Sequence, residues 1–165
     1  MEQDLVKIYT VRTEEGFKNI ASFISKEDAF KKGLLPESII GYFTNQINTN
    51  ELKPENFLRN SLFVKFLHKS IAEYAPQIKS FQVTARKLKN GWVYIIDQRT
   101  PDPNGTVPPE DIIGAFEIKK GKFINGSYKP NNNHRVLSHH GFFKLDFELY
   151  EYLLSKLHKM YESLN

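Results

Sequence analysis

Two stretches of the chain repeat their apolar residues with the period of an α-helix. The first stripe is Phe63, Leu67, Ile71 and Tyr74, and the second is Leu149, Leu153, Leu157, Met160 and Leu164. Ala75-Pro76 ends the first helix, and its start lies near Lys53-Pro54 or near Asn60, since both favour helix initiation. Asp146 is the natural N-cap of the second helix. The pattern therefore predicts two main amphipathic helices.

Other segments favour β-strands, because apolar, β-branched and aromatic residues alternate there with polar ones. They are residues 5–11, 17–24, 37–44, 81–88, 92–96 and 111–118. Segment 17–24 would equally suit one face of a helix. Asn90-Gly91 favours a type I′ hairpin turn between segments 81–88 and 92–96. Ser25 and Gly33 have the residue types that begin and end a short helix.

One motif occurs twice in the chain. Residues 109–116 and 36–43 are identical at six of eight positions, with a separation of 109 − 36 = 73 residues. Lys129-Pro130 also follows the second copy as Lys53-Pro54 follows the first. These ordered matches favour an internal duplication, although a useful loop-to-strand sequence used twice is the alternative.

The predicted fold is therefore α+β, an antiparallel sheet with the two main helices packed on it. Its halves are pseudo-duplicated β-β-β-α units. Residues 1–165 form a single domain, or two tandem half-domains of about 1–76 and 77–165 that share one core. The 13 Phe, 8 Tyr and 1 Trp supply ample apolar area for such a core.

Composition limits the classes of function. The net charge of +4 is mild, which makes nucleic-acid binding an unfavoured prediction. Cysteine is absent, which excludes disulfides and thiolate chemistry and suits a reducing compartment. The chain shows neither a secretion signal nor an apolar run long enough to span a membrane, so we expect a soluble, cytoplasmic protein without membrane contact.

Candidate chemistry gathers in the second half. His134 or His140 with Asp97 as an orienting carboxylate could perform acid–base catalysis, as in a small metal-independent hydrolase or transferase. No complete catalytic motif accompanies them. His139 and His140 are adjacent, so on a strand they point to opposite faces, and we predict neither a metal nor another cofactor.

Loops on a rigid scaffold commonly carry function, and several second-half loops have no counterpart in the first half. We therefore predict a non-enzymatic protein-binding module, whose protein partner is engaged by these loops. The predicted binding residues are Arg99, Asn131, Asn133, His134, Arg135 and His139.

Aromatic and basic residues also alternate near the middle of the chain. Phe81, Trp92 and Tyr94 lie close to Arg86, Lys87 and Lys89, a mixture that can stack and neutralise RNA. The same alternation fits a strand with one buried face, and we favour this core interpretation.

Overall fold

The computed structural model describes residues 5–44, 52–100 and 106–164 of the chain. The chain divides into two compact units. Unit 1 holds residues 1–66, 136–142 and 154–165, and unit 2 holds residues 67–135 and 143–153. Two of the four boundaries between these ranges fall inside helices, one in α2 (Ser61–Tyr74) and one in α4 (Phe147–Glu162).

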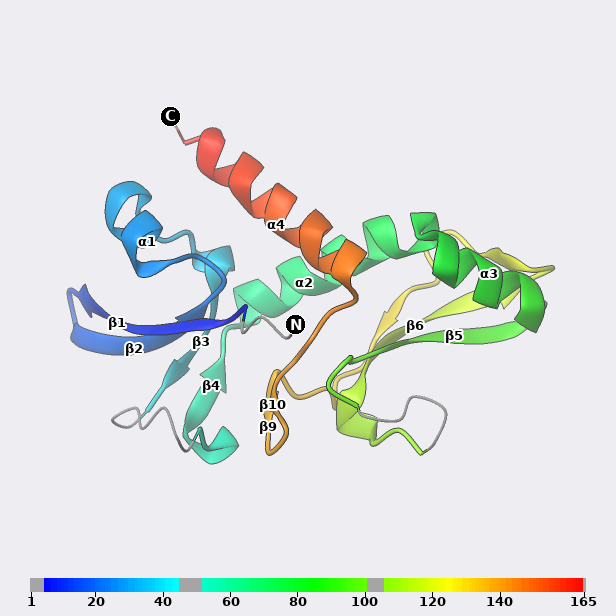
Figure 1. The fold of residues 1–165 in the computed structure, drawn as a ribbon, viewed down its shortest axis with the longest axis horizontal. Helices are drawn as coiled ribbons and strands as arrows, with labels where there is room; N and C mark the ends of the chain where they lie inside the picture. Colours follow the sequence, from blue (N-terminus) through cyan, green and yellow to red (C-terminus); the bar gives the residue numbers. More distant parts are fainter. Residues whose placement is uncertain (1–4, 45–51, 101–105, 165) are drawn as a thin grey trace. The chain divides into compact units, whose positions relative to one another are not determined.

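Unit 1 contains a four-stranded antiparallel sheet in the order β1-β2-β3-β4 and a small hairpin, β9-β10. Its strands are β1 Lys7–Thr13, β2 Gly16–Ser22, β3 Ile39–Phe43, β4 Phe57–Arg59, β9 Leu137–Ser138 and β10 Gly141–Phe142. The shorter helical elements are α1 Lys26–Lys32 and the 3-10 turns η1 Pro36–Ser38 and η2 Pro54–Asn56. In Figure 1, α1 lies beside β1 and β2 and leads into β3.

The sequence explains where α1 begins and ends. The Ser25 side chain accepts a hydrogen bond from the Asp28 N–H at 3.1 Å, and Glu27 adds negative charge at the first turn. Gly33 takes a φ of 80° and closes the helix, a conformation that costs glycine little. The prediction of a helix between Ser25 and Gly33 is confirmed.

Unit 2 contains a second antiparallel sheet, in which β6 pairs with β5, β7 and β8. Its elements are α3 Lys79–Leu88, β5 Gly91–Ile96, β6 Ile112–Lys119, β7 Lys122–Phe123, β8 Lys129–Pro130, η3 Ala75–Gln77 and η4 Pro109–Asp111. Helix α3 covers one face of this sheet, where buried Ala85, Val93 and Ile118 pack together with Phe123.

The segment 81–88 is helical, so its prediction as a strand is wrong. Phe81, Val83 and Ala85 alternate as in a strand, but Ile78 and Ala85 are the buried residues, which is a helical spacing. The Lys, Gln, Ala and Arg residues of this segment also favour helix. Asn90-Gly91 consequently joins α3 to β5, and the predicted type I′ hairpin does not form. The second half therefore departs from the predicted β-β-β-α order.

The predicted α+β class with antiparallel sheets is confirmed. Helix α2 begins at Ser61, after Asn60, and ends before Ala75-Pro76. Asp146 caps α4, because its Oδ1 accepts the Glu148 N–H at 2.9 Å. Within the described ranges, no helix has the length and apolar character needed to cross a bilayer.

A corner built around an asparagine occurs once in each unit. In unit 1 the Asn60 side-chain amide donates to the carbonyls of Pro36 and Ile39, at 2.7 and 2.8 Å. In unit 2 the Asn131 amide donates to the carbonyls of Pro109 and Ile112, both at 2.7 Å. We call each arrangement an asparagine corner. In both units the asparagine directly follows a strand, β4 or β8, and its amide bonds to the first and fourth residues of the repeated motif.

The strands beyond the corners also correspond. Gly41 in β3 and Gly114 in β6 each follow a residue, Ile40 or Ile113, that has no partner in the register with β2 or β5. A Cβ at either glycine would collide with an aromatic ring, that of Phe57 in unit 1 and that of Tyr128 in unit 2. Glycine is needed at both positions because the ring packs directly on the backbone.

The strand register changes one detail of the sequence comparison. Gly41 pairs with Arg59, and Gly114 pairs with Pro130, so Pro130 corresponds to Arg59 and not to Pro54. The match of Lys53-Pro54 with Lys129-Pro130 is therefore wrong. The internal duplication itself stays a prediction.

Candidate functional site

A cluster of buried ionisable side chains lies in unit 2, and it includes several predicted site residues. Asp97 and Arg99 follow β5, Asp111 ends the 3-10 turn before β6, and His134 follows β8. We call these four residues the polar cluster. Their side chains are no more than 3% exposed.

Asp97 is the residue that holds the surrounding loops together. Its Oδ1 accepts the backbone N–H groups of Arg99 at 3.1 Å and Lys144 at 2.9 Å. Its Oδ2 lies 2.9 Å from His134 Nε2. The imidazole can donate a hydrogen bond from Nε2 to this carboxylate oxygen. Asp97 thus fixes the orientation of the imidazole.

Arg99 supplies the positive charge of the polar cluster. Its Nε lies 3.0 Å from Asp111 Oδ1 and 3.3 Å from Asp97 Oδ2. Its Nη2 donates to the backbone carbonyls of Arg135 and Glu110. The guanidinium therefore bonds to both carboxylates and to two chain segments, a use of several donors that suits arginine better than lysine.

The polar cluster has the hydrogen bonds that a stable buried network requires. The Thr100 hydroxyl donates to the remaining Asp111 oxygen, Oδ2, at 2.8 Å. Among the described residues, no buried side-chain nitrogen or oxygen lacks a partner. Fully bonded buried networks fix the conformation of the loops that carry them. A catalytic base must also reach a substrate, and the His134 side chain is only 3% exposed.

The predicted catalytic candidates are thus only partly brought together. Asp97 and His134 are in contact, whereas His140 is exposed on the β9-β10 hairpin of unit 1. Among the described residues, no group of three or more His, Cys, Asp or Glu is placed to hold a metal ion.

The predicted binding residues differ in their surroundings. Arg99 and His134 are buried, and the Asn131 amide is used within its corner. Asn133, Arg135 and His139 are exposed. His139 Nε2 lies 3.5 Å from Glu55 Oε1, but both side chains are largely in solvent, where such a contact contributes little.

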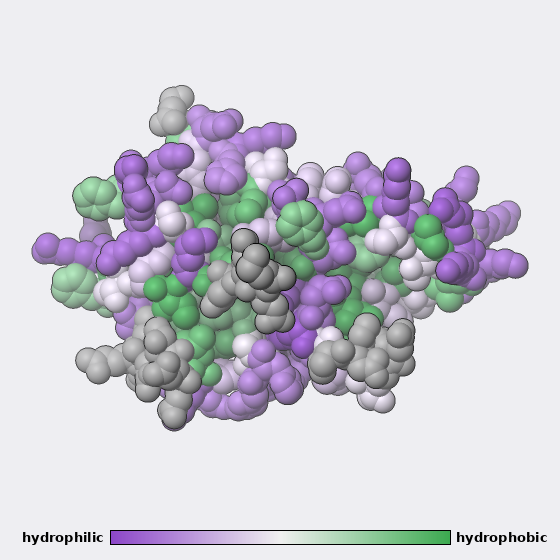
Figure 2. Space-filling model, viewed as in Figure 1, coloured by the Kyte–Doolittle hydropathy of each residue, from purple (hydrophilic) through white to green (hydrophobic). Residues whose placement is uncertain are grey.

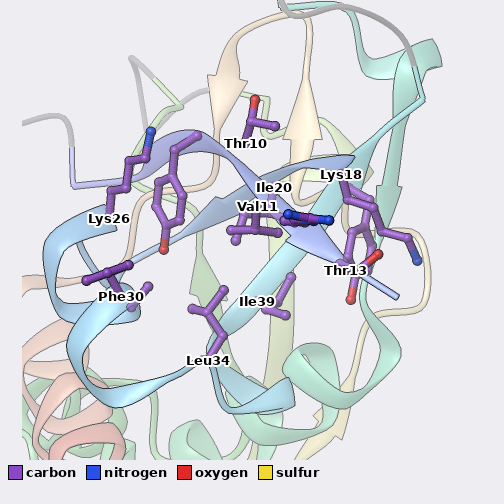
Figure 3. A pocket seen from close by; sticks show the side chains of 13 residues that line it. Thr10, Val11, Thr13, Lys18, Ile20, Lys26, Phe30, Leu34 and Ile39 are labelled. Carbon is purple, nitrogen blue, oxygen red and sulfur yellow. The ribbon is translucent and has the colours of Figure 1, made fainter. Parts of the chain in front are cut away.

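A groove in unit 1 was missed by the sequence prediction. It has a volume of about 590 Å³ and lies between α1 and the sheet. Figure 3 shows Phe30 and Leu34 on the helical side of the groove, with Val11, Ile20 and Ile39 on the sheet side. Phe30 is 92% exposed, so its ring is available to a ligand in the groove.

The groove has cations at its margin and one buried hydroxyl in its wall. Arg12, Lys18 and Lys26 are among its lining residues. Tyr9 also lines it, and its hydroxyl donates to the Ile24 carbonyl at 2.8 Å. Burial raises the pKa of Tyr9, an effect that its hydrogen bond with Ser22 partly offsets. Tyr9 therefore belongs to the fixed wall of the groove.

One sequence signal could have revealed the groove. Phe30 lies in a short helix of sequence KEDAFKK, and it is the only large apolar residue in that helix. A helix that belongs to the core carries a stripe of such residues. A lone aromatic among charges indicates a ring that the protein itself does not bury.

Compared with known proteins, the chain matches no protein-family model, no curated protein and no solved structure.

Proposed function

We propose that the protein is a non-enzymatic, cytoplasmic protein-binding module, and that its partner is an extended segment that adds to the edge of the unit 1 sheet along β1. The observation that carries this proposal is the position of β1, which is an outer strand of the sheet and lines the groove. We therefore propose a partner surface in unit 1 instead of the second-half loops that the sequence favoured.

Strand β1 has the properties of an acceptor for a further strand. It is seven residues long, and among the described residues it pairs only with β2. An unpaired edge presents a row of backbone N–H and C=O groups to solvent. A peptide strand that binds there gains backbone hydrogen bonds, and pockets beside the edge select its alternate side chains.

The groove supplies that selection. Its Phe30 and Leu34 side chains would contact apolar side chains of the added strand. Arg12 and Lys26 favour acidic residues beside them. Lys18 is already 3.1 Å from Glu15. The partner segment that fits best is therefore extended, apolar at every second residue and acidic at its flanks.

We do not extend the proposal to catalysis. The histidine and carboxylate that a hydrolase or transferase would use, His134 and Asp97, are 3% and 0% exposed and bonded to each other. In contrast, the Phe30 side chain in the groove is 92% exposed, and binding requires such access. Replacing His134 would therefore act through stability and leave peptide affinity of the folded protein unchanged.

Peptide display tests the proposal, with random peptides selected on the intact protein and the enriched sequences then synthesised. We expect apolar residues in alternation with acidic flanks, and added amide protection along β1 when the peptide binds. Phe30→Asp should weaken binding by roughly 10- to 150-fold, because contact with a phenyl ring is worth about 1.5–3 kcal/mol.

The matched control is Phe147→Asp, which changes another highly exposed phenylalanine, 69% exposed, in unit 2. It should leave peptide affinity unchanged. Peptides that bind the Phe30→Asp variant as tightly as the original protein, or that protect no amide of β1, would refute this placement of the partner.

A further inference from the structure

The sheet of unit 2 has one face that α3 does not cover. Side chains of alternate residues point to the same face of a strand, and directly paired residues share a face. Trp92 pairs with Glu117, Tyr94 with Ala115, Ala115 with Lys129, and Lys119 with Lys122. One face therefore carries two aromatic residues and three lysines, together with Glu117. We call it the aromatic–lysine face; its charged and aromatic residues are Trp92, Tyr94, Glu117, Lys119, Lys122 and Lys129.

The two aromatic rings are accessible. Trp92 is 36% exposed and Tyr94 is 54% exposed, so the interpretation of both as core residues is wrong. They are two residues apart on β5, which places them about 7 Å from each other along the strand. The Lys129 ammonium lies over the Trp92 ring, 5.1 Å from its centroid. A ring flanked by a cation in this way can stack a base while the cation meets a phosphate.

Two lysines of this face repel each other. Lys119 and Lys122 are directly opposed across an antiparallel pair, where like charges repel. Among the described residues, neither forms an ion pair with a carboxylate. A bound anion would relieve this repulsion. Glu117, the acidic side chain of this face, leaves an excess of two positive charges over the three lysines (3 − 1 = 2).

Further cations lie at the neighbouring end of the sheet. Arg86, Lys87 and Lys89 are exposed around the turn from α3 to β5. That turn is bonded to the β6-β7 turn, since the Gly121 N–H donates to the Lys89 carbonyl at 2.8 Å. Figure 2 shows hydrophilic side chains gathered at this end of unit 2, which Figure 1 locates by α3, β5 and β6. Arg86, Lys87 and Lys89 thus add cations beside the three lysines of the face.

From this geometry we propose that the aromatic–lysine face binds single-stranded nucleic acid. Trp92 and Tyr94 stack on successive bases, and Lys119, Lys122 and Lys129 contact the phosphates. Unpaired bases are required, because the bases of a duplex are stacked on one another and present no free surface to an aromatic ring. The site is in unit 2 and is independent of the peptide groove proposed for unit 1.

The single tryptophan of the chain makes this proposal directly testable, since Trp92 is the only source of indole fluorescence. Titration of the full protein with an oligothymidylate at low salt should quench that fluorescence, with a Kd in the range of about 1–100 µM. Three phosphate contacts predict a slope of roughly −2 for log K against log salt concentration.

Variants separate stacking from charge. Tyr94→Ala should weaken binding by roughly 5- to 150-fold, because one stacked base is worth about 1–3 kcal/mol. Lys119→Gln should weaken binding and make the salt slope shallower by about 0.7. Lys32→Gln and Phe30→Asp, which change exposed residues of unit 1, should leave the quenching unchanged.

The outcomes that overturn the proposal are distinct. An absence of quenching at low salt refutes it. Equal affinity for duplex DNA with no effect of Tyr94→Ala would show attraction by charge alone, and also refutes it. Vesicles containing phosphatidylserine distinguish a membrane surface: a shift of Trp92 emission by vesicles without quenching by the oligothymidylate would assign this face to lipid. None of these results bears on the peptide binding proposed for unit 1, which is tested separately.

Discussion

Replacing Arg99 by methionine should destabilise the protein severely. The guanidinium lies 3.0 Å from Asp111 and 3.3 Å from Asp97, and the two carboxylate side chains are 3% and 0% exposed. Arg99→Met removes the cation and leaves both carboxylates buried, while Met fills much of the same volume. Breaking a buried ion pair by removing one partner costs about 3–5 kcal/mol. Since a domain is stable by only about 5–15 kcal/mol, we expect a large part of the free energy of unfolding to be lost.

Urea-induced unfolding followed by circular dichroism measures this loss. The matched control is Arg135→Met, because the Arg135 side chain is exposed and only its backbone carbonyl accepts from Arg99. That control should change stability by less than about 0.5 kcal/mol. A second variant, Asp111→Asn in the Arg99→Met background, removes one of the stranded charges and should recover part of the loss.

Two results would refute this reasoning. A loss below about 1 kcal/mol for Arg99→Met would mean that water reaches the carboxylates, so that they are not truly buried. A double variant whose loss equals the sum of the two single losses would mean that Asp111 stabilises the fold independently of Arg99, through contacts such as that with Thr100.

Three further predictions concern the corners and the sheets. Asn60→Ala and Asn131→Ala should each reduce the free energy of unfolding by about 2–4 kcal/mol in urea, because each amide donates two hydrogen bonds and its Oδ1 accepts a third; a loss confined to one variant would contradict the equivalence of the corners. Gly114→Ala should lower the melting temperature through a loss of about 1–3 kcal/mol, since its Cβ would lie 2.6 Å from Tyr128 Cζ; an unchanged melting temperature would contradict this packing. Burial raises the pKa of Tyr128 above its usual value of 10.0, so the folded protein holds that proton more tightly than the unfolded chain does. The stabilisation is complete below pH 10 and declines as the pH rises, by about 1.4 kcal/mol per pH unit; Tyr128→Phe should flatten this decline in denaturant titrations at alkaline pH, and an equal slope in both proteins would contradict the assignment.

The sequence predicted those features that depend on local spacing. The stripe of α2, the cap of α4 at Asp146 and the short helix after Ser25 all follow from contacts between residues three or four positions apart. The sequence named His134 and His140 as alternative partners of Asp97, and the contact between Asp97 and His134 is seen only in the structure. The three helix predictions did not require knowledge of how the strands pair.

The features that the sequence did not predict depend on packing between distant segments. Segment 81–88 has an alternation that fits a strand, and only its contact with β5 and β6 through Ala85 shows which period is used. Trp92 and Tyr94 looked like core residues because alternation does not tell which face of a strand is buried. Arg99 is likewise charged and yet buried, which requires partners from two other segments, those of Asp111 and Arg135.

Comparison of the two asparagine corners indicates a structural role for the polar cluster. The register pairs Ile39 with Ser22 and Ile112 with Ile96, so the residue that follows each strand is Phe23 in unit 1 and Asp97 in unit 2. The residue before each repeated strand is Ser38 in unit 1, where unit 2 has Asp111.

Unit 1 therefore builds its corner without ionised groups. The Ser38 hydroxyl donates to the Leu35 carbonyl at 2.7 Å, and the Ser38 carbonyl accepts the Ser22 hydroxyl at 2.7 Å. Since neutral side chains are enough to stabilise this geometry, the corner of unit 2 does not need buried charges for itself. What unit 2 adds are the loops that carry His134 and Lys144, both bonded to Asp97. The polar cluster thus anchors these loops, and replacing Arg99 should loosen them before it disturbs β5 and β6. Hydrogen exchange of the Lys144 amide, measured against that of Val93 in β5, would show this order directly.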